Sequence, residues 1–340
     1  MLNLGIVGCG RVTNMFHLKA IEKVEGMVVV AVSDYNPERM EHVRARSGAK
    51  RGYLDYSDLL VDPDVEAVVV NTPPSLHEDM VIHALEAGKH VICEKPLARS
   101  VKSCLNIKHL QEETGLVVLP AHNYVFTPCL NIVQNLVHTG AIGDVAELHA
   151  TFENNLGAYK SKDDFRLKIE FGLVEDLLPH ILSVANELVG AAKAVVDAKG
   201  WKQSNDVIDN LNLLLETDKG IEVDCFTSWT RMIPSFKLDI YGTKGKIRTD
   251  LIRSPFQATL ESVGRRTKIG KGGGLRMYLD LLRCKHPSFK NQYLHLRGLV
   301  EGSEEPRLTV DDEIELVRMM NKVRSHLSRA QMKQRGSGDS

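Results

Sequence analysis

Apolar positions in the first third of the chain alternate between short continuous runs and stretches with helical spacing. Runs of strand length occur at residues 2–7, 27–32, 64–70, 91–93 and 116–119, and a shorter strand is predicted at 51–54. Helical spacing follows the first run and recurs at residues 36–47, 75–87 and 100–114. Strands that alternate with helices predict right-handed crossovers and therefore a doubly wound parallel sheet.

The pattern changes after a predicted helix at 128–138. Strand candidates linked by turns follow at residues 145–153, 194–201, 209–216, 221–230, 236–241 and 246–249. Residues 217–220, Thr-Asp-Lys-Gly, are a hairpin signal. The glycine-rich, basic stretch 267–274 favours a mobile loop, with phosphate binding by Lys268 and Lys271 as the alternative. Helices near 275–283, 292–300 and 311–327 complete the chain, and a broad sheet with one free face would suit dimerisation.

A chain of 340 residues favours two domains. We predict a dinucleotide-binding domain at 1–122, a substrate-binding and oligomerisation domain at 123–330, and a flexible tail at 331–340. Hydrophobic residues are 43% and charged residues 26% of the chain, which is ordinary for a soluble globular protein. The formal net charge of −1 gives no basic field for nucleic acid or an anionic membrane.

The six cysteines are scattered without a CxxC pair. This pattern suggests neither a zinc site nor a disulfide framework, and it fits a reducing cytoplasm. The longest apolar runs have strand length and are far too short to span a membrane. The sequence therefore predicts a soluble cytoplasmic protein without a metal site.

A glycine turn follows the first predicted strand. Gly8 permits a tight turn, and Gly10 allows backbone N–H groups to approach a pyrophosphate at the helix N-terminus. Asp34 ends the second strand, 24 residues after Gly10, where its carboxylate can bind a ribose diol. That charge would repel a 2′-phosphate, so NAD is favoured over NADP. The third motif position is Thr13, which predicts a slightly larger helix–strand separation. A plain glycine turn, and a helix N-cap role for Asp34, are the alternatives.

Two further strand ends carry polar residues. Asn71 follows the run at 64–70, and Glu94-Lys95-Pro96 follows the run at 91–93. Ligands bind outside the carboxyl ends of the strands in an open parallel sheet, so Lys95 would lie where a bound molecule reacts. A solvated Glu-Lys pair at an ordinary turn is the alternative.

Four motifs stand in an order that resembles the glucose–fructose oxidoreductase / inositol dehydrogenase / MocA (Gfo/Idh/MocA) family. They are Gly-Ile-Val-Gly-Cys-Gly-Arg at 5–11, Ala-Val-Ser-Asp at 31–34, Asn-Thr-Pro-Pro-Ser-Leu-His at 71–77 and Cys-Glu-Lys-Pro-Leu-Ala at 93–98. The resemblance continues at residues 121–126, 140–145, 165–166, 176–180 and 241–245. It implies an N-terminal Rossmann domain and a C-terminal α/β domain with a large, open, mainly antiparallel sheet. It also implies hydride transfer between a nicotinamide and a secondary alcohol or ketone of a sugar, cyclitol or nucleotide sugar.

The resemblance implies three catalytic residues, Lys95, Asp176 and His180. Asp176 and His180 are four positions apart, so both project from one face of a predicted helix. We expect His180 to act as general acid/base, Lys95 to stabilise the alkoxide, and Asp176 to orient His180 or bind the hydroxyl. Pro179 would bend this helix beside the pair. An ordinary ion pair on the helix face is the alternative for Asp176 and His180.

Further contacts are expected from the family pattern. Candidates for cofactor binding are Gly8, Gly10, Arg11, Val12, Asp34, Asn71, Thr72, Pro73, His77, Glu94, Lys95 and Asn123. Candidates for substrate binding are Lys95, Asn123, Tyr124, Asn155, Arg166, Asp176 and His180. The alternative for these candidates is a structural role, since Asn is common in turns and Tyr is common where two domains meet.

The sequence departs from the family at two positions. Ser183 stands where members often have Asp, and Val125 stands where they often have Arg. The family implies a homodimer or homotetramer. The alternative function is a non-catalytic NAD(P)-sensing regulator, although such a protein would be free to lose Lys95, Asp176 or His180.

Overall fold

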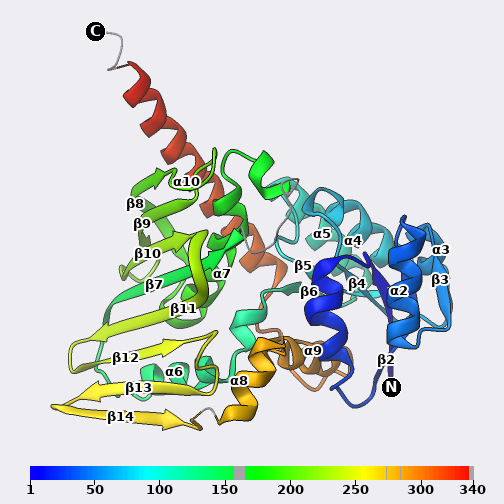
Figure 1. The fold of residues 1–340 in the computed structure, drawn as a ribbon, viewed down its shortest axis with the longest axis horizontal. Coiled ribbons are helices and arrows are strands. Elements are labelled where there is room, and N and C mark those ends of the chain that lie inside the picture. Colours follow the sequence, from blue (N-terminus) through cyan, green and yellow to red (C-terminus); the bar gives the residue numbers. More distant parts are fainter. Residues whose placement is uncertain (157–164, 273, 284, 337–340) are drawn as a thin grey trace. The chain divides into compact units, whose positions relative to one another are not determined.

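The computed structural model describes residues 1–156, 165–272, 274–283 and 285–336. The chain divides into two compact units (Figure 1). Unit 1 consists of Met1–Phe126 and Tyr278–Val317, and unit 2 of Thr127–Met277 and Arg318–Ser340. The prediction placed residues 278–317 in the second domain, whereas in the structure they pack with the N-terminal part of the chain. Phe289 stacks on Phe16 with ring centroids 4.8 Å apart, and Val310, Ile314 and Val317 of the same segment belong to the hydrophobic core of unit 1.

Unit 1 contains a six-stranded parallel sheet with the order β3-β2-β1-β4-β5-β6. Its strands are β1 (Leu2–Val7), β2 (Met27–Ser33), β3 (Arg51–Tyr53), β4 (Ala67–Val70), β5 (His90–Glu94) and β6 (Val118–Ala121). The strand order reverses beside β1, so the carboxyl ends of β1 and β4 flank the switch point at which doubly wound sheets bind ligands. The predicted Rossmann sheet is confirmed.

Helices connect these strands and complete unit 1. They are α1 (Leu18–Ile21), α2 (Pro37–Ser47), α3 (Tyr56–Leu60), α4 (His77–Glu86), α5 (Val101–Thr114) and α9 (Pro287–Val300). Side chains cap several of them: Asn36 accepts from the N–H of Arg39 at the start of α2, and Ser100 accepts from Ser103 at the start of α5. All four residues of β4 are buried, as expected for a strand with helices on both faces of its sheet.

Unit 2 is built on an eight-stranded sheet with the order β14-β13-β12-β11-β7-β10-β9-β8. The β10–β7 pair is parallel and the other pairs are antiparallel. The strands are β7 (Val145–Asn155), β8 (Ala192–Trp201), β9 (Asn210–Thr217), β10 (Glu222–Ser228), β11 (Thr230–Gly242), β12 (Gly245–Asp250), β13 (Gln257–Ser262) and β14 (Arg265–Gly270). The predicted large, mainly antiparallel sheet is confirmed.

Four α-helices of the described residues belong wholly or partly to unit 2. Helix α6 (Pro128–His138) packs against β13 and β14, and α7 (Gly172–Val189) packs against β7, β8, β9 and β10. Helix α8 (Leu275–Leu282) and helix α10 (Val310–Gly336) each pass from one unit to the other along the chain.

Two segments differ from their predicted structure. The stretch 267–274 was expected to be a loop, but its first part forms β14, which pairs along its length with β13. The predicted tail begins inside α10, which continues to Gly336, while residues 337–340 lie outside the described residues. Gln, Met, Lys and Arg at 331–335 all favour helix, so the composition supports this extension.

The cysteines in the described part of the chain, Cys9, Cys93, Cys104, Cys129 and Cys225, are free and buried. Burial raises the pKa of the Cys9, Cys104 and Cys129 thiols to about 12. Among the described helices, none combines the length and the apolar character needed to cross a bilayer.

Candidate functional site

The glycine turn after β1 is tied to the end of β4. Gly8 has φ +95°, and a Cβ at this position would lie 2.8 Å from the backbone carbonyl of Asn71. The hydroxyl of Thr13 donates to the carbonyl oxygen of Gly8 at 2.5 Å and accepts from Nδ2 of Asn71 at 2.9 Å. Thr13 therefore does more than replace the third motif glycine, because its hydroxyl bridges two loops at the carboxyl edge of the sheet.

The turn leaves room for a dinucleotide. A Cβ built on Gly10 meets no atom within 4 Å, so the backbone at the start of the helix faces open space. Oδ1 of Asn71 is buried and has no hydrogen-bond partner among the described residues. Arg11 is exposed and Val12 half-buried directly after Gly10, and Thr72 and Pro73 follow Asn71. These features fit a pyrophosphate at a helix N-terminus.

Asp34 is held in place at the end of β2. Its Oδ2 accepts from the N–H of Cys9 at 2.9 Å, and its Oδ1 accepts from the N–H of Asn36 at 2.9 Å and from Arg39 at 3.1 Å. Asn36, not Asp34, is the N-cap of α2, so the N-cap alternative for Asp34 is wrong. The carboxylate links the glycine turn to the loop after β2, and the guanidinium of Arg39 offsets part of its charge.

A buried chain of hydrogen bonds supports Glu94, the residue before Lys95. Nε2 of His17 lies 2.9 Å from Oε1 of Glu94, and Nδ1 of His17 lies 2.6 Å from the hydroxyl of Tyr293. A carboxylate only accepts, so Nε2 of His17 donates to Glu94, and Nδ1 of His17 pairs with the hydroxyl of Tyr293. Oε2 of Glu94 accepts from the backbone N–H of Lys95 at 3.2 Å. The contacts fix the backbone from which the Lys95 side chain extends.

The network also favours the charged form of Glu94. Burial alone would raise the pKa of this carboxyl, but the hydrogen bond from His17 and the charges of His17, Lys95 and His77 outweigh it, so the pKa is lowered. Burial, with a smaller effect from Glu94, raises the pKa of Tyr293 well above its usual range. Glu94 is therefore an anion beside the half-buried Lys95.

The loop after Lys95 is held from two sides. The Lys95–Pro96 peptide bond is cis. Nδ1 of His77 lies 2.7 Å from the carbonyl oxygen of Pro96, and Nε2 lies 2.8 Å from that of Thr72. On the other side, Glu313 of α10 contacts His122 and accepts from the N–H of Leu97 at 3.3 Å.

His77 was expected to bind the cofactor, and the structure gives it a different place. The side chain is fully buried, and both ring nitrogens face backbone carbonyls. Its ring joins the loops after β4 and β5, so it can position the cofactor site without offering a ring nitrogen to the ligand.

Two other predicted residues lie in the turn after β6. Asn123 is buried and donates from Nδ2 to the hydroxyl of Ser288 at 2.9 Å, while Tyr124 is half-buried against the ring of His286. Residues 287–300 of α9 thus support this turn within unit 1.

In unit 2, Asp176 is anchored by two side chains. Its Oδ2 accepts from Nε1 of Trp229 at 3.0 Å and lies 3.3 Å from Nη1 of Arg166. Gly172 allows this packing, because a Cβ there would lie 2.1 Å from the carbonyl oxygen of Arg166 and 3.1 Å from the Trp229 ring. The predicted Arg166 and Asp176 are therefore in direct contact.

His180 lies one turn farther along α7. It is only 9% exposed, and the edge of its ring meets Phe152 of β7 at a centroid distance of 5.4 Å. The predicted Asn155 is the last residue of β7 and pairs with Thr230 of β11. Asp176 and His180 project from the same side of one helix, as their spacing predicted. Among the described residues, no group of acidic, histidine and cysteine side chains could hold a metal ion.

Three supporting residues were not anticipated from the sequence. His17 had a weak signal, because it follows Thr13 by four residues in the predicted helix after the glycine turn. Tyr293 lies 276 positions from His17, and Trp229 lies 53 positions from Asp176, so no local pattern connects them.

Comparison with known proteins agrees with this architecture. Residues 2–122 match the family model described as "Oxidoreductase family, NAD-binding Rossmann fold", and residues 131–248 match the GFO/IDH/MocA C-terminal domain. The chain is 23% identical over 321 residues to myo-inositol 2-dehydrogenase of Thermotoga maritima, which covers 92% of each protein. It is 30% identical over 168 residues to levoglucosan dehydrogenase of Pseudarthrobacter phenanthrenivorans, which covers 48% of this chain and 43% of the relative.

Solved structures share the fold along almost the whole chain. An apo levoglucosan dehydrogenase superposes with a TM-score of 0.84 at 20% identity, covering 96% of this chain and 97% of the other. A 3-ketoreductase from Actinomadura kijaniata, in complex with NADP and TDP-benzene, superposes with a TM-score of 0.81 at 22% identity, covering 96% and 98%. Both halves of the sequence match one family, so the chain is an oxidoreductase that belongs to the Gfo/Idh/MocA family.

Proposed function

We propose that this protein is an NAD(H)-dependent oxidoreductase that acts on a secondary alcohol or ketone of a sugar, cyclitol or nucleotide sugar. The names of its relatives, which include an inositol dehydrogenase, a levoglucosan dehydrogenase and a 3-ketoreductase, support this substrate class. The main observation behind the proposal is that hydrogen bonds through Glu94 hold the backbone of Lys95 at the carboxyl edge of the parallel sheet. His17, in the first helical turns after the glycine loop, contacts Glu94, so the predicted cofactor loop and the predicted catalytic lysine form one hydrogen-bonded unit.

Each of the proposed residues has its own role in the oxidation of the alcohol. A bound nicotinamide supplies the hydride acceptor. Nδ1 of His180 is buried, so we assign the base role to Nε2, which takes the hydroxyl proton. The ammonium of Lys95 stabilises the developing alkoxide, and Asp176, anchored by Trp229 and Arg166, binds the hydroxyl or orients the imidazole. In the reverse direction the same groups return the proton to a ketone.

For the cofactor we propose NAD in preference to NADP. Asp34 is 8% exposed, and its bonds to Cys9 and Asn36 hold its carboxylate at the end of β2. A fixed anion at this strand end favours a ribose diol and disfavours a 2′-phosphate. The solved relatives include complexes with NADH and with NADP, so the preference has to be measured for this chain.

Turnover with a substrate panel tests the function. The purified protein is mixed with NAD and with cyclitols, anhydro-sugars and nucleotide sugars in turn, and NADH formation is followed by its absorbance. We expect oxidation of at least one member, and a loss of about 10²–10⁴-fold in kcat for His180→Ala. A Lys95→Ala variant that binds NAD normally and keeps full activity would remove Lys95 from the mechanism.

The alternative, a non-catalytic NAD(P) sensor, predicts a different result. It would bind NADH tightly and turn over no cyclic polyol or nucleotide sugar. The presence of Lys95, Asp176 and His180 together favours the enzyme, since a sensor does not need all three. A cytoplasmic location and a homodimeric or homotetrameric state remain predictions.

A further inference from the structure

The loop that carries Lys95 continues into the apolar core of unit 1. Leu97 is completely buried, and it belongs to the same hydrophobic cluster as Val310 and Ile314 near the start of α10. The backbone N–H of Leu97 donates to Oε2 of Glu313 at 3.3 Å. Glu313 is therefore the acceptor that holds the chain two residues after Lys95.

Glu313 is bonded in turn to the residue that follows β6. Its Oε1 contacts Nε2 of His122, and a carboxylate only accepts, so the imidazole donates this hydrogen bond. Nδ1 of His122 is buried without a hydrogen-bond partner, so within the described part of the chain the imidazole is hydrogen-bonded through Glu313 alone. The side chains of His122 and Glu313 are only 1% and 2% exposed.

The pair is embedded in apolar surroundings. Val310, Ile314 and Val317, which lie on either side of Glu313 along α10, all belong to the hydrophobic core. Burial raises the pKa of the Cys104 thiol to about 12, and the charge of Glu313 adds to this effect, so the carboxylate also lies near α5. A buried charge loses its hydration, and the attraction within a buried pair often only offsets that loss. Two apolar side chains could fill the same space at similar stability, so stability alone does not account for the pair.

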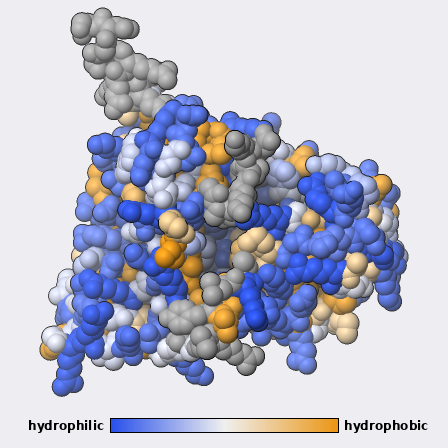
Figure 2. Space-filling model, viewed as in Figure 1, coloured by the Kyte–Doolittle hydropathy of each residue, from blue (hydrophilic) through white to orange (hydrophobic). Residues whose placement is uncertain are grey.

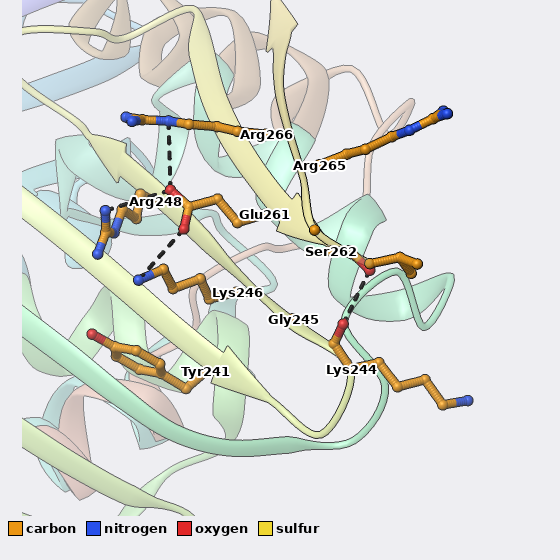
Figure 3. Close-up of a pocket in the computed structure, with 11 residues that line it drawn as sticks. Tyr241, Lys244, Gly245, Lys246, Arg248, Glu261, Ser262, Arg265 and Arg266 are labelled. Carbon is orange, nitrogen blue, oxygen red and sulfur yellow. Dashed lines mark hydrogen bonds and ion pairs between the residues drawn. The ribbon is translucent and has the colours of Figure 1, made fainter.

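Ion pairs on the surface of unit 2 differ in this respect. Glu261 of β13 has lysine and arginine side chains from β12 and β14 at 3.5 Å around a hollow (Figure 3). Hydrophilic residues dominate the surface over β12–β14 (Figure 2), and 26% of the Glu261 side chain is exposed. Water hydrates and screens such charges, so exposed pairs cost little and contribute little. The buried pair beside the Lys95 loop has lost this hydration.

We propose that Glu313 and His122 are positioning residues for Lys95. Glu313 holds the loop through the N–H of Leu97, and His122 holds the carboxylate of Glu313. Both act through the loop and not by contact with the substrate. The inference rests on the proposed oxidoreductase function, in which the ammonium of Lys95 stabilises the alkoxide. A misplacement of such a group by about 1 Å can lower the rate about a hundredfold, so a small shift of the loop is enough to matter.

A polar pair specifies one position of the loop better than apolar contacts do. Hydrogen bonds are directional, and a buried network of them rigidifies its surroundings. Leu97 lies in the loop after β5, and His122 directly follows β6, which pairs with β5. The carboxylate of Glu313 thus ties together two neighbouring loops at the edge where an open parallel sheet binds ligands.

Variants that separate stability from activity test the proposal. Glu313→Leu leaves the buried imidazole of His122 without its partner, so the urea midpoint should fall. Adding His122→Phe removes the unpaired imidazole and should restore most of the midpoint, but the N–H of Leu97 still lacks its acceptor. We therefore expect kcat of the double variant to stay about tenfold or more below wild type, while the Kd for NADH changes by less than about threefold.

Two further variants serve as controls. Glu313→Gln keeps an oxygen for the N–H of Leu97 and offers an amide N–H to Nε2 of His122, so kcat should stay within about threefold of wild type. Asp62→Leu removes another buried carboxylate of unit 1, whose side chain is 1% exposed and which accepts from the N–H of Asp64. Asp62 lies in the turn before β4, at the other end of the strand from the candidate site. Asp62→Leu should therefore lower the urea midpoint without lowering kcat.

Hydrogen exchange of the Leu97 amide gives a readout that needs no substrate. It is followed by mass spectrometry of a peptide that covers residues 94–99. We expect exchange about tenfold or more faster in the double variant than in wild type, and near the wild-type rate in Glu313→Gln and Asp62→Leu. A wild-type protein without turnover would count against the proposed function, and the exchange rates would then decide whether the pair holds the loop.

Three results would overturn the proposal. In the first, kcat of the double variant recovers together with its urea midpoint, as a purely structural pair requires. In the second, the Leu97 amide of the folded double variant exchanges at the wild-type rate. In the third, Glu313→Gln loses as much kcat as the double variant although it retains an acceptor for Leu97.

Discussion

The hydroxyl of Tyr293 lies 2.6 Å from Nδ1 of His17, and this contact joins the C-terminal part of unit 1 to the helix after the glycine turn. Tyr293 is completely buried. Removing its hydroxyl would leave Nδ1 of His17 without its hydrogen bond, and a buried unsatisfied group costs about 1–3 kcal/mol. We therefore expect Tyr293→Phe to lower the free energy of urea unfolding by that amount.

A second tyrosine–histidine pair provides the control for this prediction. The hydroxyl of Tyr56 lies 2.7 Å from Nδ1 of His83, but the pair is exposed. Water can replace the lost hydrogen bond there, so Tyr56→Phe should change stability by no more than about 0.5 kcal/mol. Equal losses in the two variants would contradict the importance of the buried bond.

Trp229 is expected to affect the substrate rather than the cofactor. Trp229→Phe removes the bond from Nε1 to Oδ2 of Asp176 and leaves only Arg166 of the two anchors. We expect the loss of this hydrogen bond to raise the activation free energy by about 1.4 kcal/mol, which lowers kcat/KM about tenfold. The Kd for NADH should not change, because both anchors lie in unit 2. Trp201→Phe, on β8, is the control, and a matching loss of kcat/KM there would indicate a general effect of tryptophan removal.

Asp34 is expected to set the cofactor preference. Asp34→Asn keeps an oxygen for the N–H of Cys9 and removes the negative charge near the expected position of a 2′-phosphate. We expect the ratio of kcat/KM with NAD to that with NADP to fall by about tenfold or more, equivalent to at least about 1.4 kcal/mol. Parallel assays with the two cofactors measure it. Asp58→Asn, an exposed acid on α3, should keep the wild-type ratio.

The turn between β13 and β14 can be stabilised. Val263 has φ +52° and is followed by Gly264 at φ +70°, which is the left-handed pair required by a two-residue hairpin turn. A β-branched residue is strained there, and Asn tolerates this conformation. We expect Val263→Asn to raise the free energy of unfolding by about 0.5–1 kcal/mol. Val196→Asn, on an exposed strand position of β8, should not stabilise; a gain at both sites would indicate a solubility effect.

The same turn explains why part of the second sheet was missed in the sequence. Val263-Gly264 lacks the Asn-Gly or Asp-Gly signature, and the glycines and lysines that follow favour a loop. Pairing with β13 overrides that local preference. The Rossmann sheet was predictable because its strands are buried on both faces and therefore read as continuous apolar runs.

The candidate site was predictable only where its glycine and polar residues belong to short sequence motifs. Gly8, Asn71 and Glu94 each end a strand, and parallel topology brings such ends to one edge. Tyr293 and Trp229 contribute through contacts far along the chain, which local spacing does not encode. His77 matched a family motif, but the motif alone does not reveal that both of its ring nitrogens face backbone carbonyls.

The burial of the cysteines has a practical consequence. A thiol with a pKa of about 12 has almost no thiolate at neutral pH, and the thiolate is the form that reacts with peroxides and alkylating reagents. Cys9 lies within the expected nucleotide loop, so oxidative damage there would be harmful. Its protection by the fold indicates that the nucleotide loop should tolerate storage and assay in air without added reductant.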